Sequence, residues 1–346
     1  MYTNAAKKRI PIYGGIELTY RCNNKCVHCY CDITNAEDTA SKELSCSEIC
    51  NFIDQIVEEG CLWLQITGGE PLLRPDFGEI YVHAKEKGLL VRVFTNGTLI
   101  TPEIANLFLE YTPFAVEIPL YGTTKNVHES ITKVSGSFER CIQGIHLLTQ
   151  RNIPVIIKTM PMSLNQHEFT SIKEYANQQG LEFRFDPIIN PGLNGSKKPY
   201  DVRLFPEQIV KIDLEDEERY TAWSELGQKY FGIIPESEDI FPCGAGKITF
   251  QLDPYGYVSP CILFRLNGHN IRENKFKKIW YECFSETNFR EWYEDITCKK
   301  CNLISLCNIC PGRLKIEEDG YKQPIKYICD IAHLRANALG FIKLQK

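Results

Sequence analysis

The sequence has no apolar run that approaches the roughly 18 residues needed to cross a bilayer, so no membrane-spanning helix is expected. A basic patch at residues 7–9 is not followed by an apolar segment, so a secretory signal peptide is not expected either. Excess positive charge is also missing: the formal net charge is -5, which does not favour binding to nucleic acid through bulk charge. These absences predict a cytoplasmic protein that binds neither membranes nor nucleic acid.

Cysteine, by contrast, is abundant, with 16 residues in a chain of 346. Disulfide frameworks are typical of small secreted proteins, whereas this chain is long enough for one large and one small domain and has no signal sequence. Most of the cysteines gather towards the two ends of the chain. This distribution favours metal sites over disulfides, and an anoxic or well-reduced cytoplasm is expected.

Short apolar runs alternate with amphipathic segments over the first two thirds of the chain. Ser45 and Thr101 stand where helix N-caps are expected, and Gly60, Gly88 and Gly180 follow three of the predicted helices. Such alternation predicts an α/β fold with a parallel sheet, and six strand–helix units, rather than eight, suggest an open barrel. The expected strands are 15–20, 62–67, 90–95, 114–120, 153–160 and 181–188, and the expected helices are 46–59, 76–87, 102–111, 137–151 and 166–179.

Candidate functional residues follow the ends of the predicted strands, where barrels of this kind carry their chemistry. Cys22, Cys26 and Cys29 follow the first strand in the spacing C-x3-C-x2-C. Thiolates are the soft ligands of iron–sulfur clusters, and three of them leave one iron of a [4Fe–4S] cluster open for chemistry. A zinc site with His28 as the fourth ligand, or a set of structural thiols, is the alternative, although His28 stands at a spacing unlike the usual zinc patterns.

The stretch from Glu17 to Tyr30 resembles the cysteine motif of the radical S-adenosylmethionine (SAM) enzymes. In that family the open iron chelates the amino and carboxylate groups of SAM, and an electron from the cluster cleaves SAM to a 5′-deoxyadenosyl radical. The resemblance implies a partial (β/α)6 TIM-like barrel. It also implies that SAM and a [4Fe–4S] cluster, held by the three cysteines, are cofactors.

The same resemblance implies a set of SAM contacts. Gly68-Gly69-Glu70 follows the second strand and resembles the family motif that holds the amino group of SAM, since a carboxylate accepts hydrogen bonds from an ammonium group. His28 occupies the position of an aromatic residue that packs near the adenine. Asn96 and Lys158 end the third and fifth strands, where each could reach the ribose or carboxylate of SAM or could be a structural loop residue.

A second group of cysteines lies in the C-terminal part of the chain. Cys243 is followed by Gly256 and Cys261, then by the run C-x2-C-x5-C-x2-C that ends at Cys310, and finally by Cys329. This arrangement resembles the SPASM domain of many radical SAM enzymes and departs from it in one interval, x2 before Cys310 where the family has x3. A rubredoxin-like or zinc-ribbon site is the alternative interpretation of the two C-x2-C pairs.

In SPASM proteins such cysteines bind two auxiliary iron–sulfur clusters. The resemblance implies that Cys243, Cys261 and Cys310 bind auxiliary cluster I. Seven thiolates would then serve two clusters, and one iron would lack a cysteine ligand. That iron is open, or Glu238 or Asp239 closes the site, or the cluster is smaller than [4Fe–4S]. Auxiliary cluster II takes Cys298, Cys301, Cys307 and Cys329. The remaining cysteines are expected to be non-ligands: Cys31, Cys46, Cys50, Cys61, Cys141 and Cys283.

The expected domains are a radical SAM core over 1–205, a helical linker over 206–242 and a SPASM domain over 243–346. The leading hypothesis is an enzyme that abstracts hydrogen from a ribosomally made peptide and forms a thioether or carbon–carbon crosslink. No leader-recognition domain fits before the first strand, so recognition would need a separate leader-binding protein or the barrel mouth. The reductant would be a flavodoxin or a ferredoxin.

Two alternatives to this hypothesis stay open. The first is oxidation or decarboxylation of a small molecule or a protein side chain by a radical SAM/SPASM enzyme. The second belongs to another class, a non-catalytic iron–sulfur electron carrier. The Gly68-Gly69-Glu70 motif argues against a carrier, because a carrier has no need of a site for the SAM amine.

Overall fold

The computed structural model describes residues 2–31, 40–233, 243–265, 268–284, 297–317 and 323–343. The chain divides into two compact units, the first comprising residues 1–202 and 243–287 and the second comprising residues 203–242 and 288–346. These units are defined by contacts in space, and each takes up two separate stretches of the chain. The three expected domains, which follow chain order, remain a prediction.

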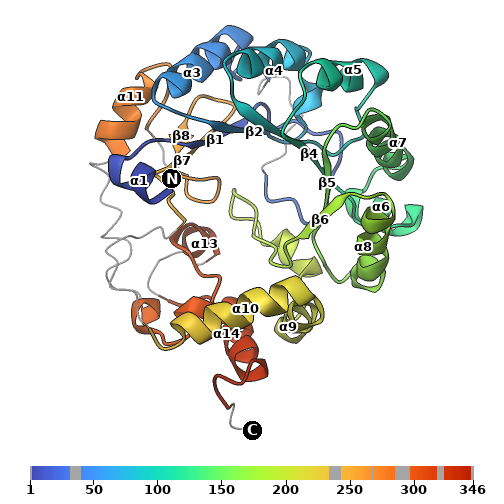
Figure 1. Ribbon diagram of the computed structural model, residues 1–346, viewed down its shortest axis with the longest axis vertical. Coiled ribbons are helices and arrows are strands. Elements are labelled where there is room, and N and C mark those ends of the chain that lie inside the picture. Colours follow the sequence, from blue (N-terminus) through green and yellow to red (C-terminus); the bar gives the residue numbers. More distant parts are fainter. Residues whose placement is uncertain are drawn as a thin grey trace. The chain divides into compact units, whose positions relative to one another are not determined.

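The first unit is built on an eight-stranded sheet with the strand order β6-β5-β4-β3-β2-β1-β7-β8. Every pairing is parallel except that of β7 with β8. The curved sheet does not close on itself (Figure 1), which confirms the predicted open α/β barrel. The strands are β1 (Tyr13–Glu17), β2 (Trp63–Thr67), β3 (Leu90–Phe94), β4 (Ala115–Pro119), β5 (Val155–Thr159), β6 (Glu182–Phe185), β7 (Thr249–Leu252) and β8 (Val258–Ser259).

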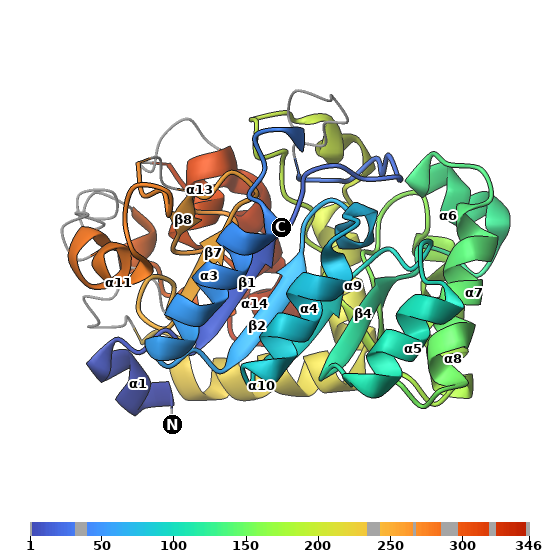
Figure 2. The ribbon, with the colours of Figure 1, turned by 90° about the horizontal axis from the view of Figure 1, so that it is seen from above.

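Helices cover the outer face of this sheet (Figures 1 and 2). Alternate strand residues such as Val91 and Val93 are fully buried, whereas the residues between them are only partly buried, as expected when one side of a strand packs against helices. The helices are α3 (Cys46–Glu58), α4 (Phe77–Glu86), α5 (Pro102–Glu110), α6 (Lys125–Thr132), α7 (Ser137–Thr149) and α8 (Phe169–Gln178), with α1 (Tyr2–Lys8) before the first strand.

The predicted helix boundaries have a clear local basis. Ser45 and Glu48 form a reciprocal capping box at the start of α3, and the Thr101 hydroxyl accepts the backbone N–H of Ile104 at the start of α5. The glycines expected after three helices adopt positive φ angles, 91° at Gly60, 83° at Gly88 and 65° at Gly180. Glycine takes this conformation without a steric penalty, so these three helix ends are confirmed.

The structure differs from the expected elements in several places. The sheet contains two strands beyond the six that were expected, β7 and β8. β1 ends at Glu17 rather than at residue 20, because the carbonyl oxygens of Thr19 and Arg21 accept backbone N–H groups of the turn after β2. The short helix α6 was not predicted. The apolar residues of the segment 276–292 have the spacing of one amphipathic helix. In the structure α11 (Phe276–Lys278) continues as a π-helical turn, Ile279–Cys283, and residues 285–292 lie outside the described ranges.

The second unit is helical. A buried ion pair lies at its centre: Asp213 of α9 is 2.6 Å from Arg335 of α14, and Arg219 of α10 contacts the same carboxylate at 2.6 Å. The helices are α9 (Pro206–Glu215), α10 (Glu217–Tyr230), α13 (Pro311–Glu317) and α14 (Lys326–Ala338), joined by 3-10 turns at Thr297–Lys300 and Ile304–Leu306. Among the residues that the structure describes, no helix combines the length and apolar composition that crossing a membrane requires.

Candidate active site and cluster-binding segments

One cavity of about 330 Å³ in the first unit gathers most of the residues predicted to bind SAM and its cluster. It lies at the carboxyl ends of the barrel strands, as expected for a fold of this class. The predicted residues that line it are Cys22, Cys26, His28, Cys29, Gly68, Gly69, Asn96 and Lys158. Glu70 does not line the cavity, but its carboxylate is bonded to the backbone N–H of Asn96, which does.

The cysteine loop is fixed to the barrel by backbone hydrogen bonds. The N–H groups of Lys25 and Val27 donate to carbonyl oxygens at the end of α6, at 2.9 and 3.0 Å. Burial raises the pKa of the Cys22 thiol to about 11 and holds that of Cys26 well above its usual value, whereas the hydrogen bond from Cys31 lowers the pKa of Cys29.

The two glycines of the Gly-Gly-Glu motif let two backbone segments approach each other closely. A Cβ atom on Gly68 would lie 2.4 Å from the Thr19 carbonyl oxygen, and one on Gly69 would lie 2.3 Å from that of Arg21. The φ angle of Gly68 is also positive, at 143°. The N–H of Gly69 donates to the Thr19 oxygen at 2.7 Å, so the motif is bonded directly to the segment that enters the cysteine loop.

The carboxylate of Glu70 is fully buried and well supplied with hydrogen bonds. Oε1 accepts from the Thr95 hydroxyl at 2.7 Å and from the Leu72 N–H at 3.1 Å, and Oε2 accepts from the Asn96 N–H at 2.7 Å. Burial raises the pKa of Glu70 to about 7, against the opposing effect of these bonds. A carboxylate offers about four acceptor positions, so three of those of Glu70 are occupied within the protein. Because this side chain is fully buried and does not line the cavity, its contact with the SAM ammonium remains a prediction.

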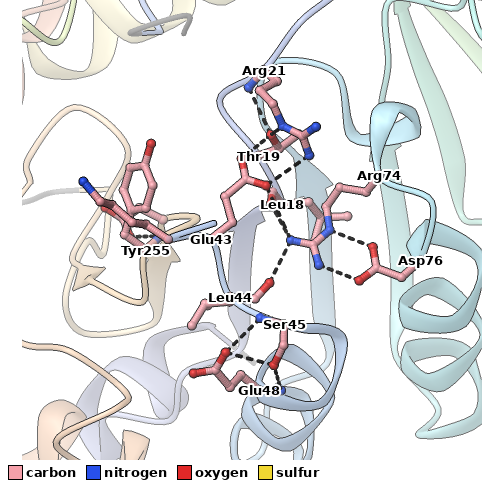
Figure 3. A network of polar contacts seen from close by, with 12 residues as sticks. Leu18, Thr19, Arg21, Glu43, Leu44, Ser45, Glu48, Arg74, Asp76 and Tyr255 are labelled. Carbon is pink, nitrogen blue, oxygen red and sulfur yellow. Dashed lines mark hydrogen bonds and ion pairs between the residues drawn. The ribbon is translucent and has the colours of Figure 1, made fainter. Parts of the chain in front are cut away.

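Arg74 connects the surroundings of both motifs (Figure 3). Its guanidinium donates to the carbonyl oxygens of Leu18 at 3.1 Å and Leu44 at 2.9 Å, and it pairs with Asp76 at 2.6 Å. Glu43 completes the network, because its carboxylate accepts from the Thr19 hydroxyl and lies 3.2 Å from the Arg21 guanidinium. The backbone just before Cys22 is thereby tied to the segment just after Glu70.

His28 lies in the cavity wall with its ring edge-on to Tyr121, at a centroid distance of 4.7 Å. Its Nε2 is 3.1 Å from the Tyr121 hydroxyl, while its buried Nδ1 has no hydrogen-bond partner among the described residues. Burial lowers the pKa of His28 to about 4, so the ring is neutral near pH 7. A neutral, partly unpaired ring in this position suits a contact with a nucleobase, and that role remains a prediction.

Lys158 and Asn96 already have protein partners in this structure. The Lys158 ammonium lies 2.9 Å from the Glu117 carboxylate and 4.6 Å from the ring centroid of Phe94. The Asn96 amide lies against the cysteine loop, 2.8 Å from Asn23 Oδ1. Their predicted contacts with SAM therefore compete with existing interactions.

Sequence reasoning missed Thr95, Glu117 and Tyr121, which support or line the cavity. Glu117 stands between the buried Val116 and Ile118 on β4, so strand alternation would have placed it on the inner face of the barrel. Thr95 and Tyr121 stand next to strand ends, the position used to find the other candidates. Residue type alone did not separate them from ordinary loop residues.

In the second unit, the four cysteines assigned to auxiliary cluster II surround one small cavity of about 20 Å³. Arg335 bridges two of the cysteine-bearing segments: it lies on α14 with Cys329, and it donates to the Leu306 carbonyl, next to Cys307, at 2.6 Å. The cysteines that line this cavity are Cys298, Cys301, Cys307 and Cys329, together with His333 and several aliphatic residues.

Within the described ranges, no three or more His, Cys, Asp or Glu side chains converge closely enough to hold a single metal ion. The cysteines of an iron–sulfur cluster each bind a different iron, so they surround a volume rather than a point. Thiolates are the soft ligands that iron–sulfur clusters select, so the donor sets of both cysteine groups fit such clusters.

The predicted ligands of auxiliary cluster I belong to different parts of the molecule. Cys243 and Cys261 lie just before β7 and just after β8 in the first unit, and Cys310 belongs to the second. Glu238 and Asp239 lie outside the described residues. This ligand set and the fourth position of the cluster therefore remain predictions.

The cysteines expected to be non-ligands have varied surroundings. Cys61 and Cys141 are buried as small apolar side chains. Cys46 and Cys50 face each other along α3 with their sulfur atoms 3.9 Å apart. Cys31 lines the large cavity, and its thiol points to the Gly68 carbonyl at 3.9 Å.

Comparisons with known families agree with this arrangement. The family model of the radical SAM superfamily matches residues 16–176, and the model of the SPASM iron–sulfur cluster-binding domain matches residues 243–311. The chain belongs to the radical SAM superfamily and carries a SPASM domain. It is therefore an enzyme of a class that uses SAM, a [4Fe–4S] cluster and auxiliary iron–sulfur clusters.

The curated relatives cover nearly the whole chain. The AdoMet-dependent heme synthase of Methanosarcina barkeri is 28% identical, with 86% of this chain and 89% of the relative covered. The Fe-coproporphyrin III synthase of the same organism is 30% identical, with 87% and 82% covered. The mycofactocin maturase MftC of Mycobacterium tuberculosis is 27% identical, with 87% and 78% covered.

Solved structures share the fold. Streptococcus suis SuiB bound to its precursor peptide SuiA superposes with a TM-score of 0.71 at 16% identity, covering 93% of this chain and 77% of SuiB. At this identity the likeness concerns the fold alone. It agrees with the open barrel described above.

Proposed function

We propose that this radical SAM/SPASM enzyme modifies a ribosomally made peptide and forms a thioether or carbon–carbon crosslink in it. The observation that carries the SAM chemistry is the single cavity that contains the three cysteines beside the Gly-Gly-Glu turn. The peptide substrate is supported by the relationship to the mycofactocin maturase and by the fold shared with SuiB, whose structure contains a precursor peptide.

The residues of the cavity have distinct roles in this proposal. Cys22, Cys26 and Cys29 hold the catalytic cluster, and Glu70 binds the SAM ammonium. His28 contacts the adenine. When bound, SAM and the reduced cluster supply a 5′-deoxyadenosyl radical that abstracts hydrogen.

Electrons and atoms must balance across the crosslink. To form a thioether, the substrate loses one hydrogen atom from carbon, one proton from the thiol and one electron. We propose that the auxiliary clusters of the SPASM segment accept that electron, with Cys298, Cys301, Cys307 and Cys329 as the ligands of cluster II. Cys243, Cys261 and Cys310 are the proposed ligands of cluster I.

The proposal includes partners and a compartment. A flavodoxin or ferredoxin would supply the electron that starts each turnover, and a separate leader-binding protein would present the peptide. Oxygen degrades clusters of this type, so a reducing cytoplasm is the proposed location.

A second candidate function is oxidation or decarboxylation of a small molecule. The observation that favours it is the similarity to the AdoMet-dependent heme synthase and the Fe-coproporphyrin III synthase, which are as close to this chain as the peptide maturase is. Both candidates use the same SAM cavity. They differ in the molecule that enters it.

One experiment separates the candidates. The chain is reconstituted anaerobically, iron and sulfide are counted, and 5′-deoxyadenosine is measured after reduction, first alone and then with candidate substrates. Peptides encoded next to the gene are compared with iron-coproporphyrin, and products are identified by mass spectrometry. A peptide that loses two mass units and stimulates SAM cleavage supports the first candidate. Turnover of the porphyrin with no peptide product would replace it with the second.

A further inference from the structure

Three polar side chains form a closed ring of hydrogen bonds between the cysteine loop and the end of β3. Asn96 Nδ2 lies 2.8 Å from Asn23 Oδ1, and Asn23 Nδ2 lies 2.8 Å from the Thr98 hydroxyl. The Thr98 hydroxyl in turn lies 2.6 Å from Asn96 Oδ1. Asn23 stands directly after Cys22, so the ring attaches the first cysteine of the loop to the barrel.

The ring determines the orientation of the Asn96 amide. Its Oδ1 accepts two hydrogen bonds, from the hydroxyl of Thr98 and from the backbone N–H of Thr98 at 2.9 Å. An amide nitrogen donates and does not accept hydrogen bonds. If the Asn96 amide were flipped, its NH2 group would face the hydroxyl and the N–H of Thr98, which are themselves donors. The Nδ2 group must therefore point towards the cysteine loop.

Asn96 Nδ2 carries two hydrogen atoms, and the ring uses only one of them. The other neighbour of this nitrogen is Cys22 Sγ at 3.9 Å. The same sulfur accepts the backbone N–H of Asn24 at 3.4 Å. The backbone N–H of Asn96 meanwhile donates to Glu70 Oε2 at 2.7 Å. Asn96 thus bonds to the carboxylate of the SAM motif through its backbone and to the cysteine loop through its side chain.

We propose that Asn96 is a positioning residue for the catalytic cluster, which donates an N–H···S hydrogen bond to Cys22 and raises the reduction potential of the cluster, rather than a ligand of the SAM ribose or carboxylate. This inference rests on the proposed role of Cys22 as a cluster ligand. Reduction adds negative charge to the cluster and its sulfur ligands, so a fixed donor stabilises the reduced form more than the oxidised form.

The test is a potentiometric titration of the reconstituted enzyme followed by electron paramagnetic resonance. The signal that changes when SAM is added identifies the catalytic cluster. Asn96→Asp keeps the size of the side chain and replaces both side-chain N–H donors by a carboxylate oxygen, so the midpoint potential of that signal is expected to shift to a more negative value. Asn106→Asp makes the same change on the exposed surface of α5 and is expected to leave the potential unchanged.

Two outcomes would overturn the proposal. An Asn96→Asp enzyme with full iron content and an unchanged potential, but weaker SAM binding, would return Asn96 to the role of a SAM contact. A wild-type enzyme with no SAM-responsive cluster would overturn the assignment of Cys22 and this proposal together. The first result leaves the proposed function intact, so the two failures are distinguishable.

Thr98 provides a second route if Asn96→Asp does not retain its cluster. Thr98→Val keeps Asn96 but removes the hydroxyl that orients its amide, and we expect a smaller negative shift in potential. Thr98→Ser restores the hydroxyl and should restore the wild-type potential. An unchanged potential in Thr98→Val would count against the role of the ring.

Discussion

The two cysteine groups that surround cavities differ in the room beside their sulfur atoms. Cys22, Cys26 and Cys29 line a cavity of about 330 Å³ with many other polar side chains in its wall. The four cysteines of the second unit line a cavity of about 20 Å³, together with aliphatic residues and His333. Three thiolates leave a coordination position that needs space for a ligand, and four thiolates do not. The group of three cysteines thus lies beside the large cavity and the group of four beside the small one, as expected for one catalytic and one electron-transfer cluster.

The largest effect is expected when the three cysteines beside the large cavity are removed. Replacing Cys22, Cys26 and Cys29 by Ala is expected to abolish formation of 5′-deoxyadenosine, because no cluster remains to reduce SAM. Iron counting should show that the auxiliary clusters still assemble. Continued SAM cleavage by the triple variant would contradict the assignment of the catalytic cluster.

The matching change in the second unit should have a different consequence. Replacing Cys307 and Cys329 by Ala is expected to lower the iron content by about four per chain, the number in one [4Fe–4S] cluster. SAM should still be cleaved, but substrate product should be lost, because the electron has no acceptor. Product formation at the wild-type rate would show that this group of cysteines is not needed for turnover.

A smaller effect is expected from Glu70→Gln, which leaves both cysteine groups intact. Loss of a charge-assisted hydrogen bond to the SAM ammonium should weaken binding by about 1.5–3 kcal/mol, or roughly 10- to 150-fold. Equilibrium binding of SAM to the reconstituted enzyme measures this change. Glu86→Gln, on the exposed end of α4, is the matched control and should bind SAM normally.

Glu70 also predicts a pH dependence. Because burial raises the pKa of this carboxyl to about 7, the charged form that binds an ammonium is lost as the pH falls through that value. SAM affinity of the wild-type enzyme should therefore decrease between about pH 8 and pH 6, and that of Glu70→Gln should change less. Parallel curves for the two proteins would argue that Glu70 does not bind the amine.

The smallest effect concerns auxiliary cluster I, predicted to have only three cysteine ligands. Cys283→Ser is expected to leave the iron content unchanged, since Cys283 lies in the π-helical turn and is a predicted non-ligand. Cys243→Ser, the matched change at a predicted ligand, should reduce it. Loss of iron in Cys283→Ser would show that this cysteine is the fourth ligand.

The features that depend on a local pattern of residues could be predicted from the sequence alone. Strand and helix alternation gave the open barrel, and Ser45 and the glycines after the helices mark boundaries that backbone geometry alone requires. The cysteine spacing and the Gly-Gly-Glu turn were visible because their chemistry needs particular residues close together in the chain. These signals led to the family that the comparisons identify.

Features that depend on distant contacts were not predictable in this way. β1 ends early because Leu18 donates to the Thr67 carbonyl and the following residues meet the Gly-Gly-Glu turn. The ring that joins Asn23 to Thr98 connects residues 75 positions apart in the sequence. An asparagine next to a strand end could equally bind a ligand or a neighbouring loop, and only the fold shows which partner its amide faces.

The pairing of β7 with β1 has a consequence for how this chain can be recombined. β7 comes from the segment that the SPASM model matches, yet Phe250 and Gln251 occupy the space that side chains on Gly14 and Gly15 of β1 would need. Strands that pack this closely must therefore be exchanged as a pair when a chimera is made. A chimera joined to a relative at residue 243 would set a foreign β7 against these glycines, whereas exchanging residues 203–242 together with 288–346 would leave the pair intact.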